Sequence, residues 1–298
     1  MNLKGKKFLV TGGSGFIGSH LIERLTEYGA YVENFDLSQG RDIQDEKQLS
    51  QAIKKKSDAI FHLAGFSGSK ESNENIEKSF KINTLATVNL IEHVLKYSPK
   101  TKIVLSSSRL EYGTPKYLPV DEKHPTNPIS AYGLSKLCAT QMVLIYYKTK
   151  SLNVTVFRTS NVYGSHPHAK FSGYNIVNHF IDLAKQNKTL TIFGEGDQKR
   201  DYLYIDDMID AFILSADSKA NGKIYNLGLG SAISLKEMAE LIIKTIGKGR
   251  IRYVRWPDNY KAVETGDYVT DISKIKRELG FSPKIDFETG ILRTINNN

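Results

Sequence analysis

The chain has 298 residues, with 41 lysines and arginines against 32 aspartates and glutamates, so its formal net charge is +9. Hydrophobic residues make up 40% and charged residues 24%, which is ordinary for a globular protein and excludes a disordered, collagenous or coiled-coil chain. The single cysteine, Cys138, excludes an internal disulfide and a multi-cysteine metal cluster, so we expect no metal site and a reducing, cytoplasmic location.

Membranes and nucleic acids are not expected partners. No apolar run approaches the roughly 20 residues that span a bilayer, and no secretion signal opens the chain. The lysines are dispersed, with runs no longer than Lys54-Lys55-Lys56, whereas a nucleic-acid-binding face needs dense basic residues with stacking aromatics. A small ligand that carries phosphate would use a few of these charges equally well.

The first half of the chain alternates between two kinds of apolar pattern. Strand character occurs at residues 8–10, 31–35, 58–63, 102–105 and 153–157, and helical spacing occurs at 16–25, 45–55, 74–97 and 131–147. Strands that alternate with helices predict an α/β fold with a doubly wound parallel sheet covered on both faces.

The regular alternation of strand and helix patterns ends near residue 165, which predicts a second, smaller region. A helical pattern at 174–187 and a glycine-rich segment at 193–197 follow, and no flexible linker separates the two parts. We therefore expect a first domain at 1–165, a smaller C-terminal α/β region at 166–298, and a return of the chain to the first domain near 199–228. A ligand cleft is expected between them.

Residues Thr11–Gly18 read TGGSGFIG and lie between the first predicted strand and the first predicted helix. A turn of this kind needs Gly12, Gly15 and Gly18 because residues without Cβ let the backbone approach a pyrophosphate. The N–H groups at the helix start then face the phosphates. The segment predicts a dinucleotide site.

Asp36 ends the second predicted strand, at the distance from the glycines where an acidic side chain commonly binds the ribose hydroxyls and repels a 2′-phosphate. This predicts NAD rather than NADP. Asp36 as a turn residue or helix cap is the alternative interpretation, and nearby Arg41 leaves NADP open.

Tyr132 and Lys136 form a Tyr-x-x-x-Lys pair, and the spacing of four places both side chains on one helix face. Tyrosine titrates near pH 10, so a neighbouring ammonium is needed before it can exchange a proton near neutrality. The pair alone is a weak pattern, and an ordinary helix face is the alternative.

The strand at 102–105 continues into Ser106-Ser107-Ser108, at the carboxyl end where open parallel sheets bind ligands. A hydroxyl there would polarise a substrate oxygen. Serines in this position more often cap or turn, so none of them is convincing alone.

Together these features resemble the extended short-chain dehydrogenase/reductase family, and within it the nucleotide-sugar epimerase/dehydratase branch. The resemblance covers almost the whole chain. Besides the residues above, it rests on the segments 62–65, 158–164, 190–194, 198–207, 271–273 and 279–283 and on Asn83.

The resemblance implies a Rossmann-like fold, a homodimer, and a function for each matching position. It implies Ser108, Tyr132 and Lys136 as the catalytic residues. It implies an NAD site at Gly12, Gly15, Phe16, Ile17, Gly18, Asp36, Asp42, Ile43, Leu63, Ala64, Asn83, Tyr132 and Lys136. Ser108, Asn161, Phe193 and Arg200 would bind a nucleotide-diphosphate sugar, with Arg200 facing the phosphates; a surface ion pair is the alternative for Arg200.

Two departures from the family bear on the reaction. The interval from Asp36 to Asp42 is shorter than in typical 4-epimerases of this branch, a shape seen more in its 4-keto-sugar reductases. The related 4,6-dehydratases have an acidic residue directly after the catalytic serine or threonine, where this chain has Arg109-Leu110. Glu111 comes one position late, and in an extended segment it should point away from Ser108. We therefore expect no dehydratase activity.

The leading hypothesis is a C4 epimerase of nucleotide sugars that acts through a 4-keto intermediate. A reductase of a nucleotide-linked 4-keto-6-deoxy sugar is the alternative, since both reactions share the hydride step. A non-catalytic NAD-sensing protein is disfavoured because Ser108, Tyr132 and Lys136 are all present.

Overall fold

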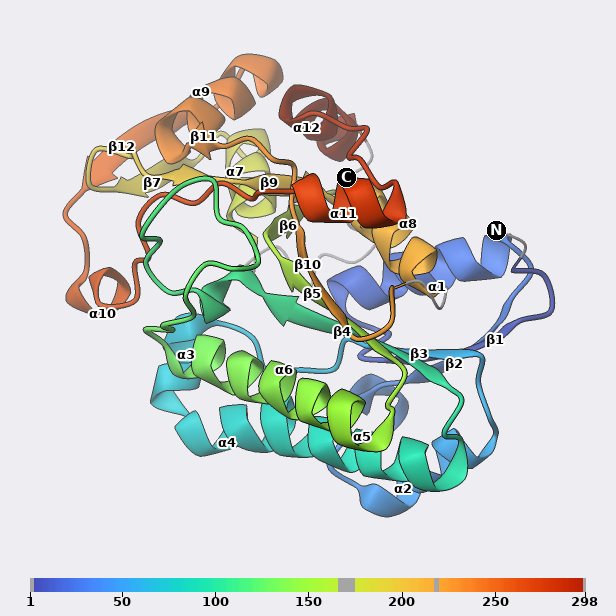
Figure 1. Cartoon of the computed structure of the whole chain (residues 1–298). Coiled ribbons are helices and arrows are strands. Elements are labelled where there is room, and N and C mark those ends of the chain that lie inside the picture. The colour runs from blue at the N-terminus through green and yellow to red at the C-terminus, as the bar shows by residue number, and fades with distance from the viewer. Residues whose placement is uncertain (1–2, 166–174, 217–219, 297–298) are drawn as a thin grey trace.

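Six parallel strands form the central sheet of the computed structural model, which describes residues 3–165, 175–216 and 220–296 (Figure 1). The order across the sheet is β2-β1-β3-β4-β5-β10. In chain order the strands are β1 (Lys7–Thr11), β2 (Tyr31–Phe35), β3 (Ala59–His62), β4 (Lys102–Ser108), β5 (Val154–Thr159) and β10 (Lys223–Leu227).

Helices cover both faces of this sheet because successive strand residues point to opposite sides. In β1, Leu9 packs in a core cluster with residues of α2 (Glu46–Lys54), α5 (Ala86–Tyr97) and α6 (Ala131–Lys150). Phe8 and Val10 belong to a second cluster, which includes residues of α1 (Phe16–Glu27) and α8 (Ile205–Ser215). Figure 1 shows α2, α5 and α6 on one side of the sheet and α1 and α8 on the other. The predicted fold class is confirmed.

The chain reverses its winding direction between β1 and β3. From β1 it adds β2 on one side, and then it adds β3, β4 and β5 on the other side. The carboxyl ends of β1 and β3 diverge at this point, and open parallel sheets bind ligands in the crevice there. The glycine-rich turn follows β1 directly.

The second region packs on the same face as α1 and α8. It contains α7 (Ile176–Lys185), β7 (Thr189–Phe193) paired with β12 (Arg250–Val254), and β8 (Lys199–Arg200) paired with β11 (Ile233–Ser234). The strand β6 (Asn161–Tyr163) pairs with β9 (Tyr202–Tyr204). The helices α9 (Leu235–Ile246), α10 (Asp258–Lys261), α11 (Ser273–Leu279) and α12 (Phe287–Asn296) complete it.

The expected start of the second region, at 166, lies outside the described residues. Beyond it, β10 brings the chain back into the main sheet. Three short elements, α3 (Ser69–Glu74), α4 (Ile76–Phe80) and a π-helical turn at Lys81–Leu85, precede α5. Among the described residues, no helix is long and apolar enough to cross a membrane.

Candidate active site

The turn after β1 approaches other backbone so closely that two of its glycines cannot be replaced. A Cβ on Gly12, which has a φ of +71°, would lie 2.6 Å from Ala64 N, and a Cβ on Gly18 would lie 2.3 Å from Gly12 O. Gly15 precedes α1, whose first turn contains no acidic residue. The positive end of this helix dipole therefore faces the crevice, as binding of a pyrophosphate requires.

A cavity of about 300 Å³ adjoins this turn and is lined by Asp36, Arg41, Asp42, Ile43 and Ala64, among others. Asp36 Oδ1 accepts a hydrogen bond from Ser38 N at 2.8 Å, and its Oδ2 accepts one from Ser14 N at 3.1 Å. The helix-cap interpretation of Asp36 is therefore realised, while the same residue also lines the cavity.

Arg41, which left NADP open, has a partner of its own. Its guanidinium forms an ion pair with Glu33 and lies 5.8 Å from the centre of the Phe35 ring. Lys55 Nζ also pairs with Glu33 Oε1, at 2.8 Å, so this single carboxylate is shared by two cations and does not fully neutralise Arg41. The preference for an adenosine with a free 2′-hydroxyl therefore rests on Asp36, which lines the same cavity.

A second cavity, of about 490 Å³, begins at the same glycines and contains the predicted catalytic side chains. Gly12, Gly15, Phe16, Ile17, Gly18 and Leu63 line it at one end, and Ser108, Tyr132 and Lys136 line it farther along. Both cavities share Gly12, Gly15 and Leu63. The residues present thus fit an extended dinucleotide that runs from Asp36 to Tyr132.

Tyr132 and Lys136 share one face of α6, as the spacing predicts, and both are desolvated. Burial raises the pKa of Tyr132 to about 12, and its hydrogen bond with Ser108 opposes that shift. Burial lowers the pKa of Lys136 to about 8, and its Nζ donates to Ser106 O at 3.0 Å. The carboxylate of Glu111 raises the pKa of both groups.

Glu111 was expected to point away from Ser108 because the segment was interpreted as extended, and that premise is wrong. Residues Arg109–Glu111 form a 3-10 turn capped by Ser108, whose Oγ accepts from Leu110 N at 3.1 Å, and they are not extended. The Glu111 side chain is fully buried in an ion pair with Arg158 (Nε–Oε2, 2.6 Å). It also accepts from Ser107 and Thr140 hydroxyls, so its lone pairs are already in use.

Two polar residues beside the site support its walls. Asn83 lines neither cavity. Its side-chain amide forms two hydrogen bonds with the backbone of Phe66: Oδ1 accepts from Phe66 N at 2.8 Å, and Nδ2 donates to Phe66 O at 3.0 Å. The two ring nitrogens of His62 form hydrogen bonds with the hydroxyls of Thr11 (2.7 Å) and Thr87 (3.0 Å). Burial lowers the pKa of His62 to about 3. His62 is therefore neutral near pH 7 and does not act as an acid. Among the described residues, no cluster is suited to hold a metal ion.

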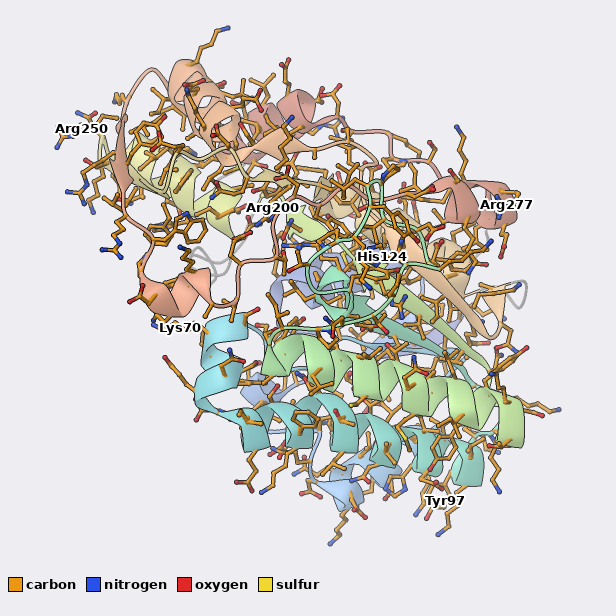
Figure 2. The ribbon with its side chains drawn as sticks, turned by 60° about the vertical axis from the view of Figure 1, so that its left-hand side comes forward. Lys70, Tyr97, His124, Arg200, Arg250 and Arg277 are labelled. Atoms are coloured by element: carbon orange, nitrogen blue, oxygen red, sulfur yellow. The ribbon has the colours of Figure 1, made fainter. Side chains whose placement is uncertain are left out.

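Besides Ser108, three residues are expected on the substrate side, and none of these three lines the second cavity. Asn161 Nδ2 donates to Asp201 O at 3.0 Å. The centre of the Phe193 ring lies 5.5 Å from the centre of the Trp256 ring and 5.4 Å from that of the Tyr260 ring. Lys70 Nζ of α3 lies 5.5 Å from the centre of the Tyr260 ring, so α3 and α10 meet across the two regions (Figure 2).

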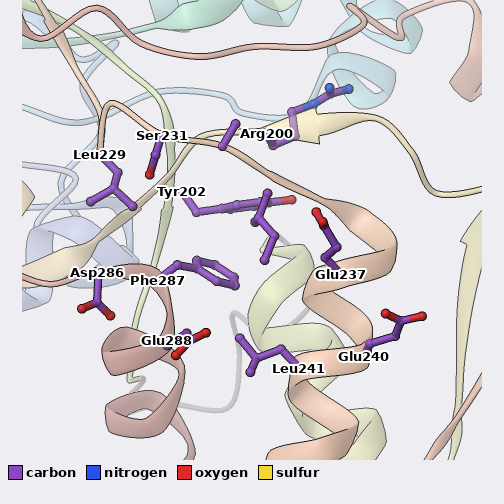
Figure 3. Close-up of a pocket in the computed structure, with 12 residues that line it drawn as sticks. Arg200, Tyr202, Leu229, Ser231, Glu237, Glu240, Leu241, Asp286, Phe287 and Glu288 are labelled. Carbon is purple, nitrogen blue, oxygen red and sulfur yellow. The ribbon is translucent and has the colours of Figure 1, made fainter.

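Arg200, the third of these residues, is buried, and its Nη2 forms an ion pair with Glu264. Its Nη1 donates to the carbonyls of Lys199 and Gly266. Arg200 thus forms an ion pair, but a buried one and not the surface pair of the alternative interpretation, and its contact with phosphates stays a prediction. Arg200 also borders a third cavity, of about 700 Å³, that none of the expected catalytic residues lines (Figure 3). Figure 3 shows the guanidinium directed away from the other side chains of that cavity.

Several residues that line the second cavity were not among the expected site residues, although Ser106 and Ser107 belong to the serine run noted in the sequence. Ser106, Ser107, Thr159, Ser160 and Asn175 also line this cavity. Four of them stand at the carboxyl ends of β4 and β5, which are neighbours in the sheet. The rule that drew attention to Ser108 would have found Thr159 and Ser160, had it been applied to the next strand.

Known proteins of similar sequence act on nucleotide sugars. The chain is 35% identical over 304 residues to a putative UDP-glucose 4-epimerase of Methanocaldococcus jannaschii, in an alignment that covers 97% of both chains. It is 30% identical over 316 residues to a UDP-N-acetyl-alpha-D-glucosaminuronate decarboxylase of Bacillus cytotoxicus, again over 97% of both. The solved structure of UDP-glucose 4-epimerase from Thermotoga maritima with UDP-glucose matches with a TM-score of 0.89 at 28% identity, covering 98% of both chains.

The model of the NAD dependent epimerase/dehydratase family matches residues 8–228, well over half of the chain. At the level of the family this confirms the predicted resemblance and the expected NAD cofactor. The similar proteins named above include an epimerase and a decarboxylase, so the exact reaction is a separate question. The chain belongs to the NAD-dependent epimerase/dehydratase family.

Proposed function

We propose that the chain is an NAD-dependent C4 epimerase of a nucleotide-diphosphate sugar, acting through a 4-keto sugar. The observation that carries the proposal is the second cavity, because it joins the glycine-rich turn to Ser108, Tyr132 and Lys136. Epimerases among the similar proteins support it. We further propose that Asp36, Asp42 and Ile43 hold the adenosine and that Lys136 contacts the nicotinamide ribose.

NAD, when bound beside Tyr132 and Lys136, would supply the acceptor and donor for a hydride exchanged with C4 of the sugar. Tyr132 takes the proton from the C4 hydroxyl and later gives it back, acting as general base and then as general acid. Ser108 hydrogen-bonds the same sugar oxygen and holds it beside the phenol. Lys136 supplies positive charge that favours the phenolate.

The surroundings of Ser108 argue against a 4,6-dehydratase. Elimination of water needs an acid to protonate the departing C6 hydroxyl. Glu111 is the acidic residue nearest in sequence to Ser108, and its carboxylate is fully buried against Arg158. Net reduction of a 4-keto-6-deoxy sugar needs only Ser108, Tyr132 and the reduced cofactor, and it remains the second candidate.

Two experiments test the proposal. The small molecules released on denaturing the purified protein are identified first, since retained NAD favours an epimerase over a reductase that exchanges its cofactor. The protein is then incubated with UDP-, dTDP-, CDP- and GDP-hexoses, and C4 epimers are expected. A 4-keto-6-deoxy product formed from an unmodified hexose would show dehydratase chemistry and would contradict the role given to Glu111.

A homodimer is part of the same proposal. Leu85, Leu134 and Ile145, in the π-helical turn and in α6, are about half exposed at 56%, 43% and 52%, and these helices lie side by side on one face (Figure 1). Large apolar side chains in this arrangement are typical of an interface. Light scattering on the purified chain measures the mass; a monomer at micromolar concentration contradicts this part.

A further inference from the structure

The residue expected to bind the substrate's diphosphate already holds a carboxylate. Arg200 Nη2 pairs with Glu264 Oε1, and Nη1 donates to the carbonyl of Gly266 in the same turn. Glu264 Oε1 also accepts from Gly266 N at 2.9 Å. The turn that follows α10 thus presents an anion to Arg200 in the way that a phosphate would.

A second guanidinium lies beside this pair. Arg109, directly after Ser108, is buried, donates to Thr265 Oγ1 at 3.1 Å and lies 5.0 Å from the centre of the Tyr268 ring. Burial and the charge of Arg200 lower the pKa of Arg109 to about 10, which still leaves it charged near neutrality. Two guanidiniums and one carboxylate therefore give the cluster one excess positive charge.

We propose that Glu264 sets the affinity of this site for the substrate's diphosphate, because its carboxylate competes with the phosphates for Arg200. This inference rests on the proposed function, and it assigns to Glu264 a part that the sequence did not suggest. It makes Glu264 a residue that sets binding affinity by its charge, without any contact with the reacting atoms.

The competition follows from the limited number of donors on Arg200. The two N–H groups of Nη1 donate to the carbonyls of Lys199 and Gly266, and one N–H of Nη2 donates to Glu264, so the other N–H of Nη2 and that of Nε are left for an anion, beside the carboxylate. A diphosphate must displace Glu264 or lie next to it. Displacement breaks a charge-assisted bond, and close approach brings negative charges within a few ångströms of one another, so either arrangement weakens binding.

Glu264→Gln removes the negative charge and keeps an oxygen that can accept from Gly266 N. We expect UDP to bind this variant at least about tenfold more tightly than the wild type, a difference of about 1.4 kcal/mol. Uridine, which has no phosphate, should bind both proteins equally. Glu240→Gln is the matched control: Glu240 lines the third cavity, and among the described residues it has no ion pair (Figure 3). It should leave UDP affinity unchanged.

Calorimetry with the purified protein gives these affinities, with CDP, dTDP and GDP titrated in parallel. UDP affinity that is equal or weaker in Glu264→Gln would overturn the inference, as would an equal gain in Glu240→Gln. If no nucleoside diphosphate binds any variant while NAD still binds, the proposed function fails as well. If Glu264→Gln has a lower melting temperature than the wild type, Glu264→Ala replaces it in the titrations, and the same tenfold gain in UDP affinity is expected.

Discussion

Replacing Glu111 by glutamine is expected to destabilise the fold and not merely to reduce catalysis. The carboxylate is the counter-charge of the buried Arg158 guanidinium, with side chains 0% and 4% exposed and a separation of 2.6 Å. Glutamine can still accept from Ser107 and Thr140, so the change removes the charge while keeping the shape. What remains is a desolvated cation without a counter-charge, whose Nη1 still donates to the Tyr112 hydroxyl at 3.0 Å.

The magnitude follows from that uncompensated charge. Breaking a fully buried ion pair from one side costs about 3 to 5 kcal/mol of unfolding free energy, because the remaining ion keeps its desolvation penalty. For a chain of this size a loss of this order lowers the melting temperature by roughly 10 °C. Arg158→Met in addition removes the stranded cation, so the double variant should regain at least half of the lost stability.

Urea unfolding followed by circular dichroism measures these differences. Glu77→Gln is the surface control, since Glu77 pairs with Lys81 one helical turn away and its side chain is 81% exposed. That variant should not move the midpoint. A loss below about 1 kcal/mol in Glu111→Gln would refute the structural role and would return Glu111 to the candidates for a catalytic acid.

Four other predictions follow. Tyr132→Phe should keep the fold and cut epimerase turnover by about 100-fold or more, as the loss of an acid/base group does; unchanged turnover would exclude the tyrosine. Lys136→Met should lose activity as well, but it should not lower stability at pH 7. The Lys136 pKa is about 8 in the fold and about 10.5 in the unfolded chain, so wild-type stability should rise between those pH values, and the variant's melting temperature should lack that rise. Asp36→Ala should weaken the binding of NAD more than that of NADP in fluorescence titrations. An unchanged preference for NAD over NADP would mean that other residues discriminate between the two cofactors. Gly12→Ala should abolish NAD binding, because its Cβ would lie 2.6 Å from Ala64 N; retained affinity would mean that the turn can move.

Local patterns predicted the elements of the first domain well. β2 has the predicted bounds, and α6 begins at the predicted residue, because burial in a doubly covered sheet imposes long apolar runs that sequence displays directly. The same logic placed Ser108, Tyr132 and Lys136 in one cavity. It works because a strand end and a helix face are local properties of the chain.

Local patterns do not display which residues pair across long stretches of the chain. Glu111 meets Arg158 across 47 residues, and Arg200 meets Glu264 across 64. No local spacing encodes such pairs, so Glu111 was interpreted from its nearest neighbours as extended, which is wrong, while phosphate binding and an ion pair both stayed open for Arg200. Asn83 at the cofactor stays a prediction; in this structure its amide bonds the backbone of Phe66.

One of these distant pairs, Glu111 with Arg158, also bears on Tyr132, the proposed acid/base residue. Within this fold, burial alone would keep Tyr132 protonated well above neutral pH, and the full charge of Glu111 would raise its pKa further. Arg158 opposes that effect, because it neutralises Glu111 at 2.6 Å. The guanidinium of β5 therefore acts on the phenol of α6 through the carboxylate that follows β4, which makes Arg158 a positioning residue and not a catalytic one. Its removal should move the pH optimum of turnover upward as well as destabilise the fold, whereas a purely structural residue would leave the optimum where it is.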